Sequence, residues 1–248
     1  MEIKTHISPK ILFHMYRADL PMEFIDKLNK HIDDNVITKN QNLGENLVGQ
    51  INQNKKSIQL NIDMFDTDMG KMLKKILDNC SKNYLNNIKH ADALPDTFEA
   101  WTVHSYSGDY NPLHDHGTIT PSGLSMVLYL KVPKCISDLS ETVDDLYNAS
   151  GACDGFTYFN WFHTTPLAVQ QFYMAGEEYV KPIVGRLLIF PNWLKHAVMP
   201  FHGEGERRTL AANANIITTS VFDWKNESSE KLNELLTFIR KKRKNILD

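Results

Sequence analysis

Two histidines separated by one residue are the first feature of this sequence that could carry chemistry. His114 and His116 flank Asp115 in the run Asn111-Pro112-Leu113-His114-Asp115-His116-Gly117. In an extended strand, side chains two residues apart share a face, so the two histidines can point together while Asp115 points the other way. Imidazole is the commonest metal ligand in proteins, and this pair could form half of a metal site. Taken alone, such a pair in a strand is more often a polar surface pair than a metal site.

Two later segments supply candidate partners for the histidine pair. Residues 184–190 predict a buried strand, a Pro/Asn turn follows, and His196 lies just beyond that turn. Arg208 stands at the start of a strand that continues with small residues. Small residues leave room for a ligand inside a barrel, and an arginine can grip a carboxylate through two parallel hydrogen bonds. Taken singly, His196 could be a surface or capping residue and Arg208 an exposed ion-pair partner.

The elements that must position these residues are short β-type runs in the second half of the chain. Glycine, proline and asparagine punctuate them, as is typical of strands joined by turns. The runs are 98–106, 124–132, 156–159, 183–190 and 208–218. Many short strands without intervening helices predict an antiparallel sandwich or barrel. The acidic segment 137–152 and the polar segment 176–181 are expected to be loops at its mouth.

Helices are predicted on both sides of this β region. Residues 19–34 place four apolar side chains on one face, with Pro21 where a first turn tolerates proline. Residues 69–84 follow the same spacing, with lysines on the wet side. Residues 50–59 between them read as a loop, with a short strand at 57–62. Near the end, 228–240 predicts an amphipathic helix.

The composition limits the classes of protein to which the chain can belong. The chain has 248 residues, of which 42% are hydrophobic and 23% charged, so it can fill a core and cover it with an ordinary polar surface. The formal charge of −3 gives no global attraction to nucleic acid. The basic run 240–244 complements the dipole of a helix end and supplies few phosphate contacts. A nucleic-acid partner is therefore not expected.

Membrane and export signals are also missing from the sequence. No run approaches the ~18 uninterrupted apolar residues of a membrane span, and residues 1–17 lack the pattern of a signal peptide. Cys80, Cys135 and Cys153 are odd in number and far apart, which indicates reduced thiols. We expect a cytoplasmic protein without a membrane partner, in the host cytoplasm if the source is viral.

The order of the three segments from Trp101 to Asn213 resembles the 2-oxoglutarate/iron(II) oxygenase superfamily. It is closest to oxygenases met in bacteria and marine tailed phages and shares features with prolyl-hydroxylase-like enzymes. The superfamily has a His-x-Asp/Glu motif, a distal histidine, and then an arginine or lysine. The matching positions here are His114, His116, His196 and Arg208. The first ninety or so residues resemble the superfamily poorly.

The resemblance implies a mainly β, α+β chain built on a double-stranded β-helix, the jelly roll of cupins. Residues 1–95 would be a helical extension packed on the barrel, 96–222 the core, and 223–248 a C-terminal helix with a basic end, all in one compact domain. It implies a hydroxylating dioxygenase that uses Fe(II), 2-oxoglutarate and O2, with ascorbate as a candidate accessory. Arg208 would hold the distal carboxylate of 2-oxoglutarate, helped by Tyr129 and Tyr106. The prime substrate, whether peptide, amino acid, nucleotide or metabolite, cannot be read.

One position departs from the superfamily pattern. His116 stands where a carboxylate ligand is usual. Asp115 could turn inward at a bulge and restore the two-histidine, one-carboxylate arrangement of non-haem iron oxygenases. Alternatively the site has three histidines, as in some cupin dioxygenases, and strand alternation favours this. A neutral third ligand would leave the metal more positive and shift its affinity and redox potential.

Two other functions fit parts of the same pattern. One is a cupin-type enzyme that uses the metal without 2-oxoglutarate. The other is a jelly-roll binding or structural protein, such as a virion component, without catalytic turnover. Arg208 and the small-residue strand after it favour the oxygenase over the cupin-type enzyme, and the structural alternative stays open.

Overall fold

The computed structural model describes residues 3–9, 13–38, 58–118, 120, 122–141, 150–162, 176–218 and 237. The predicted helix at 228–240 lies outside these residues apart from residue 237, and the basic run 240–244 lies wholly outside them.

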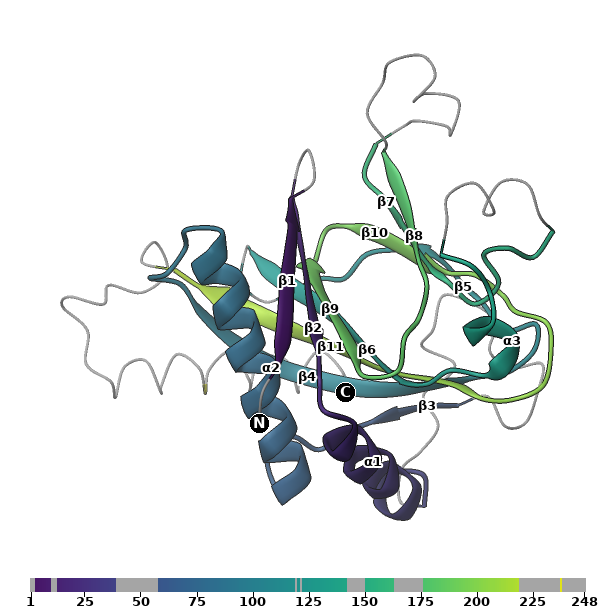
Figure 1. Ribbon diagram of the computed structural model, residues 1–248. Helices are drawn as coiled ribbons and strands as arrows, with labels where there is room; N and C mark the ends of the chain where they lie inside the picture. Colours follow the sequence, from purple (N-terminus) through teal and green to yellow (C-terminus); the bar gives the residue numbers. More distant parts are fainter. Residues whose placement is uncertain are drawn as a thin grey trace.

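The described strands form two antiparallel sheets that face each other (Figure 1). The larger has the order β1 (Lys4–Pro9), β2 (His14–Asp19), β9 (Arg186–Pro191), β6 (Gly123–Lys131), β11 (Arg207–Ile217), β4 (Leu94–Ser105) and β3 (Ile58–Asn61). The smaller has the order β5 (Asn111–His114), β10 (Lys195–Val198), β7 (Thr157–Asn160) and β8 (Glu177–Val180). This arrangement confirms the predicted mainly β class and the double-stranded β-helix.

Two helices cover the outer face of the larger sheet (Figure 1). Helix α1 (Met22–His31) continues into a π-helical turn, η1 (Ile32–Val36), and α2 (Asp68–Asn87) begins after Thr67, whose side chain accepts a hydrogen bond from the backbone of Gly70. Such a cap satisfies a backbone donor that the first helical turn leaves unpaired. A shorter helix, α3 (Lys134–Ser137), follows β6.

Strand alternation divides the apolar side chains between two cores. Leu128, Leu187 and Leu210 point from the larger sheet toward α1 and α2. Tyr129 and Phe190 point the other way, into the space between the sheets, where they pack with side chains of β7 and β8. Adjacent residues of one strand therefore lie in different environments, one facing the helices and the other facing the smaller sheet.

Most predicted elements are confirmed within a few residues, but β1, β2, β8 and β10 were not predicted as strands. Strands β1 and β2 form a hairpin at the edge of the larger sheet, and β8 falls in the segment 176–181 that was expected to be a loop. The first 95 residues are therefore not a helical extension alone, because they also contribute β1, β2 and β3 to the sheet. The unpredicted strands are short, and pairing with another strand stabilises them more than local preference does.

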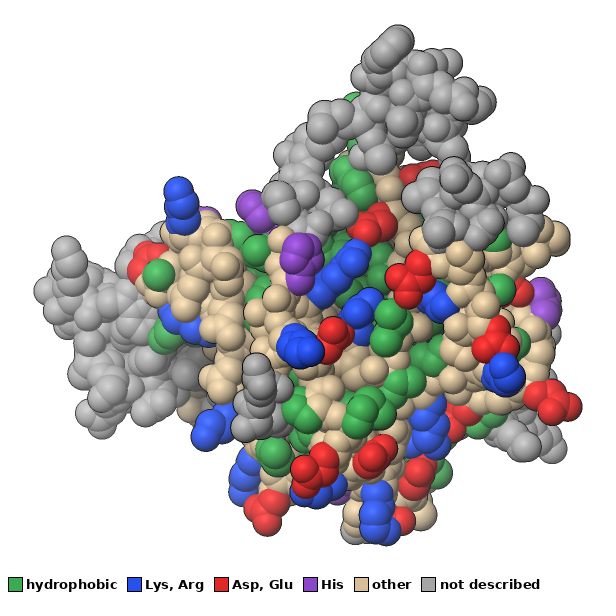
Figure 2. Space-filling view, in the orientation of Figure 1, with side chains coloured by type: hydrophobic (Ala, Val, Ile, Leu, Met, Phe, Trp, Pro, Cys, Tyr) green, Lys and Arg blue, Asp and Glu red, His purple; other side chains and the backbone are tan. Residues whose placement is uncertain are grey.

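The described surface carries mixed charge. Figure 2 shows basic and acidic side chains interspersed with hydrophobic ones over the visible face. Within the described residues, no helix is both long enough and apolar enough to cross a membrane.

Candidate metal centre and adjoining polar pocket

Three histidines converge at one end of the smaller sheet. His114 ends β5 and lies directly opposite His196 of β10, while His116 follows two residues later. Their ring centroids are 4.3 Å apart for His114 and His196, and 5.1 Å apart for each pair that includes His116. One nitrogen from each ring lies within 4.8 Å of the others, so the three nitrogens could coordinate one metal ion.

Backbone carbonyls orient two of the three rings. The Nδ1 of His114 lies 2.7 Å from the carbonyl oxygen of Pro112, and the Nδ1 of His196 lies 3.0 Å from that of Leu194. If each Nδ1–H donates to its carbonyl, each Nε2 presents a lone pair. Such bonds are the usual way in which proteins set the tautomer of a metal-binding histidine.

The burial of the three histidines keeps them neutral. Burial lowers the pKa of His196 to about 3 and that of His116 to about 4, and it also lowers the pKa of His114. The neighbouring histidines lower the pKa of His116 and His196 further. The neutral form is the one that binds metal, so at neutral pH these ligands need lose no proton.

Asp115 points away from the histidines, as strand alternation predicts. It is exposed, and its Oδ2 forms an ion pair with Lys195 at 2.9 Å. The structure shows no inward turn that would place this carboxylate beside the rings. The geometry therefore brings His116, not Asp115, to the cluster.

The inner face of the larger sheet is partly accessible opposite the histidines. Val127 and Ala211 are partly exposed although their chain neighbours are buried, so this part of the inner face is not filled by side chains. The ring of Trp101 lies 5.7 Å from that of His116, and the ring of Phe190 lies 5.0 Å from that of His196. Large side chains thus border the space while small ones form its floor.

A buried arginine lies farther along the same inner face. Arg207 is 2% exposed, its Nε donates to the carbonyl of Gly155 at 2.9 Å, and its Cζ lies 5.6 Å from the Tyr129 ring centre. Among the described residues no carboxylate forms an ion pair with this guanidinium, and burial lowers its pKa. A buried cation without a counter-charge is costly, so this position is suited to an anionic ligand.

Tyr129 and Thr157 lie beside Arg207, and these three residues form a polar end of the space between the sheets. The Tyr129 hydroxyl lies 2.7 Å from Thr157 Oγ1, and Arg207 Nη2 lies 3.4 Å from the same atom. Thr157 pairs with Val198, two residues beyond His196 on β10. At ~3.3 Å per residue, the polar end lies roughly 7 Å along the strand from the histidines.

Arg208, which the sequence predicts as the carboxylate-binding residue, lies on the opposite face. Its Nη2 pairs with Asp33 at 2.7 Å, its Nε pairs with Glu206 at 2.7 Å, and its Nη1 bonds to Asn29 at 3.1 Å. It therefore ties β11 to α1 and lies away from the histidines. The arginine of β11 that lies between the two sheets is Arg207, not the expected Arg208. The available signal was strand alternation, because Arg207 shares its face with Thr209 and Ala211, whereas Arg208 shares its face with Leu210.

Tyr106 lies on the Arg208 side as well. Its backbone amide donates to Asp109 at 2.7 Å. Burial raises the pKa of its hydroxyl, the negative charge of Glu206 raises this pKa further, and the positive charge of Arg208 lowers it. Of the two tyrosines predicted to hold the cosubstrate, the structure brings only Tyr129 to the buried arginine between the sheets.

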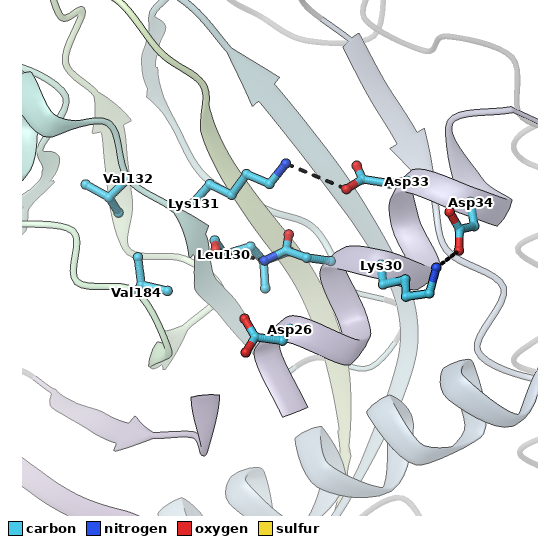
Figure 3. Close-up of a pocket in the computed structure, with 9 residues that line it drawn as sticks. Asp26, Lys30, Asp33, Asp34, Leu130, Lys131, Val132 and Val184 are labelled. Atoms are coloured by element: carbon cyan, nitrogen blue, oxygen red, sulfur yellow. Dashed lines mark hydrogen bonds and ion pairs between the residues drawn. The ribbon is translucent and has the colours of Figure 1, made fainter. Parts of the chain in front are cut away.

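A separate depression of about 660 Å³ lies on the outer face, between α1 and β6 (Figure 3). Its charged side chains face one another: Lys131 lies 3.7 Å from Asp33 and Lys30 lies 2.7 Å from Asp34. Because Asp33 also pairs with Arg208, this depression belongs to the contact between α1 and the sheet.

Comparison with known proteins identifies the class of this β region. Residues 99–213 match the family described as "Putative 2OG-Fe(II) oxygenase". This segment spans the three histidines and both arginines. Residues 99–213 are therefore similar to the 2-oxoglutarate/iron(II) oxygenase superfamily. A search of curated proteins found no match.

Several solved structures are similar to this chain at low identity. The 2-oxoglutarate-dependent epimerase SnoN from nogalamycin biosynthesis is 10% identical, with a TM-score of 0.51 over 83% of this chain and 78% of its own. A Pseudomonas putida prolyl-4-hydroxylase is 15% identical, with a TM-score of 0.49 over 81% and 91%. A prolyl hydroxylase of Paramecium Bursaria Chlorella virus-1 is 18% identical, with a TM-score of 0.46 over 81% and 95%. At these identities the likeness to SnoN concerns the fold alone.

Proposed function

We propose that this chain is a non-haem iron(II)- and 2-oxoglutarate-dependent dioxygenase that hydroxylates a substrate still to be identified. His114, His116 and His196 would hold the metal, and Arg207 with Tyr129 would hold 2-oxoglutarate. The observation that carries the proposal is the buried guanidinium of Arg207, which pairs with no carboxylate of the described residues and shares the space between the sheets with three neutral imidazoles.

The residues present suit both groups. Neutral imidazoles are ligands that Fe(II) accepts, and each of two rings is held by a carbonyl behind it. The guanidinium of Arg207 is matched to a carboxylate in charge and in its fork of donors. When bound, the metal, O2 and 2-oxoglutarate supply an oxidation that yields succinate and CO2, with one oxygen atom entering succinate and the other the substrate.

The chain's own residues would bind the metal and 2-oxoglutarate, orient them, and exclude water. Arg207 and Tyr129 would anchor the distal carboxylate of 2-oxoglutarate at the buried end of the space, so that its keto-acid end points toward the histidines. His114 and His196 come from strands of the smaller sheet and His116 from the segment just after β5, so the side facing Val127 and Ala211 is available for other ligands. Phe159 and Phe190 pack against His196 and shield it from water.

The proposed ligand set contains three histidines. Asp115 pairs with Lys195 in the structure, which favours His116 as the third ligand. Three neutral ligands leave the full charge of the metal in place, whereas a carboxylate would offset part of it. Arg207 is the feature that favours the oxygenase over a cupin-type enzyme that does not use 2-oxoglutarate.

The proposal is tested first by binding. Metal-free protein is titrated with Mn(II), and the Mn(II) complex is then titrated with 2-oxoglutarate by calorimetry. We expect one metal per chain and 2-oxoglutarate binding that depends on the metal. Metal binding without 2-oxoglutarate binding would favour a cupin-type function, and a folded protein that binds neither would favour a structural jelly roll.

Turnover is tested second. Fe(II)-loaded protein with ascorbate and 2-oxoglutarate carrying a labelled C1 carboxylate should release labelled CO2 and form succinate in equal amounts. Ascorbate enters only as a reductant that we propose to sustain the iron. Complete lack of succinate across a wide substrate panel, in protein that binds both ligands, would contradict the proposed activity.

We also propose that the protein works in the cytoplasm. Cys80, Cys135 and Cys153 are all free thiols in the structure, as expected in a reducing compartment. Fractionation of the source cells with an antibody against the chain would test this.

A further inference from the structure

A β-bulge between β5 and β10 brings Asn111 to the same side of the smaller sheet as the histidines. His114 lies opposite His196, whereas Asn111 lies opposite Val198, and the register shifts between these two pairs. Strict alternation would turn Asn111 away from His114, because they are an odd number of residues apart. The extra residue of the bulge reverses this. Asn111 and His114 therefore share the inner face, and Leu113 between them is exposed.

The side-chain amide of Asn111 contacts the nitrogen with which His114 would bind a metal. Asn111 Nδ2 lies 3.4 Å from His114 Nε2, while the Nδ1 of His114 faces the carbonyl of Pro112. With the ring proton on Nδ1, the amide donates to the lone pair of Nε2. This lone pair can serve only one partner, so a metal ion would displace the amide. At 3.4 Å the hydrogen bond is long and weak, so little free energy is lost when it breaks.

The Asn111 amide has no other partner in the part of the chain that the structure describes. Its Oδ1 is buried and forms no hydrogen bond there. Its Nδ2 contacts His114 and no other described side chain. A buried polar atom without a partner is rare in folded proteins and is often explained by a functional role. With a metal on His114, both ends of this amide are therefore free to contact a bound ligand.

Asn111 lies on the Arg207 side of the histidines. Val198, which is opposite Asn111, also pairs with Thr157, and Thr157 Oγ1 lies 3.4 Å from Arg207 Nη2. Asn111, Val198 and Thr157 thus form a row across three strands of the smaller sheet. If 2-oxoglutarate extends from Arg207 to the metal, it passes this row before it reaches the histidines.

We propose that Asn111 binds the keto-acid end of 2-oxoglutarate, by donating a hydrogen bond from Nδ2 to its carboxylate when a metal occupies His114. This inference rests on the proposed function and adds a cosubstrate-binding residue to it. Arg207 would hold the distal carboxylate, and Asn111 would orient the opposite end of the molecule. A hydrogen bond to a carboxylate is stronger than the one to a neutral imidazole that it replaces.

Calorimetry with Mn(II)-loaded protein tests this assignment. Asn111→Leu keeps the approximate size of the side chain but removes the donor. Its affinity for 2-oxoglutarate should fall on the order of tenfold, the usual scale for losing a hydrogen bond to a charged group. Its affinity for Mn(II) should equal or exceed that of the wild type, because the amide no longer competes for His114. Asn61→Leu makes the same change at an exposed position of β3 and should alter neither affinity.

Two further measurements separate the hydrogen bond from effects on folding. Asn111→Asp keeps the shape of the side chain but replaces the donor with a negative charge. It should therefore bind Mn(II) and weaken 2-oxoglutarate binding more than Asn111→Leu does. In anaerobic Fe(II)-loaded protein saturated with 2-oxoglutarate, the visible absorption band of the chelated keto acid should shift in Asn111→Leu, because the carboxylate has lost a donor. Thermal unfolding shows whether each variant is folded.

Three results would overturn the inference. They are wild-type affinity for 2-oxoglutarate in folded Asn111→Leu or Asn111→Asp, an unshifted absorption band in Asn111→Leu, and loss of Mn(II) binding in Asn111→Leu. The last would show that the amide supports the metal ligands and not the cosubstrate. Failure of the wild-type protein to bind Mn(II) or 2-oxoglutarate would instead contradict the proposed function.

Discussion

Arg207 and Arg208 are adjacent in β11, yet their guanidinium groups lie on opposite faces of the larger sheet. Arg208 forms ion pairs with Asp33 and Glu206 beside α1. Arg207 is buried against Tyr129 between the sheets, and no described carboxylate pairs with it. One arginine therefore has its counter-charges in the fold, and the other is suited to receive a counter-charge from a ligand.

Replacing Arg207 should remove cosubstrate binding without unfolding the protein. In Arg207→Met we expect affinity for 2-oxoglutarate to fall on the order of tenfold or more, because its charge-assisted hydrogen bonds are lost. Affinity for Mn(II) should not change. The ligand-free variant should be at least as stable as the wild type, since an unpaired buried charge has been removed. Calorimetric titrations and thermal unfolding measure all three quantities.

Replacing Arg208 should have the opposite effect. In Arg208→Met the free energy of unfolding should fall by about 2–3 kcal/mol. This is less than the cost of breaking a fully buried ion pair, because Asp33 is about half exposed. Binding of 2-oxoglutarate to the folded variant should match the wild type. Urea denaturation provides the first value and calorimetry the second. A variant that is stable but does not bind 2-oxoglutarate would return the cosubstrate role to Arg208.

The third metal ligand can be identified by two neighbouring substitutions. His116→Ala should weaken Mn(II) binding by at least about tenfold, because one of three ligands is lost. Asp115→Asn should leave Mn(II) affinity unchanged and cost at most about 1 kcal/mol of stability, since its pair with Lys195 is exposed. His116→Asp should still bind metal through two histidines and a carboxylate. Comparable losses in His116→Ala and Asp115→Asn would make Asp115 part of the site.

The stability of the metal-free protein should depend on pH through its histidines. Burial lowers the pKa of His196 to about 3 and that of His116 to about 4, from an ordinary 6.5. Between these values and 6.5 the unfolded chain binds more protons than the folded one, so stability falls as pH decreases through this window. Urea denaturation at pH 7 and pH 5 should show the loss, and His196→Asn should reduce it. Unchanged stability at pH 5 would mean that these histidines are not buried in the neutral form.

The hydrogen bond between Tyr129 and Thr157 should contribute to both stability and binding. Tyr129→Phe should lower the free energy of unfolding by about 1 kcal/mol, because the buried Thr157 hydroxyl loses this partner. It should also weaken 2-oxoglutarate binding by loosening the polar end around Arg207. A double-mutant cycle with Thr157→Val should give a coupling energy of about 0.5–1.5 kcal/mol. A coupling energy near zero would indicate that the hydroxyls do not interact in solution.

Much of the fold follows from local pattern. The amphipathic spacing of α1 and α2 and the apolar runs of β6 and β9 are strong signals, and the structure confirms them. Strands β1, β2 and β8 carry weak signals because they are short, and their pairing partners are distant in sequence. Their conformation is stabilised by backbone bonds to strands that a local pattern does not reveal.

The sequence by itself determined that His114 and His116 share a face and that Asp115 does not, because side chains alternate along any strand. It could not determine that His196 meets them, since this depends on the antiparallel pairing of β5 with β10. Nor could it determine which arginine of β11 faces the histidines. Alternation separates Arg207 from Arg208, but only the packing of α1 and α2 on one face of the sheet, and of the smaller sheet on the other, makes Arg207 the inner residue.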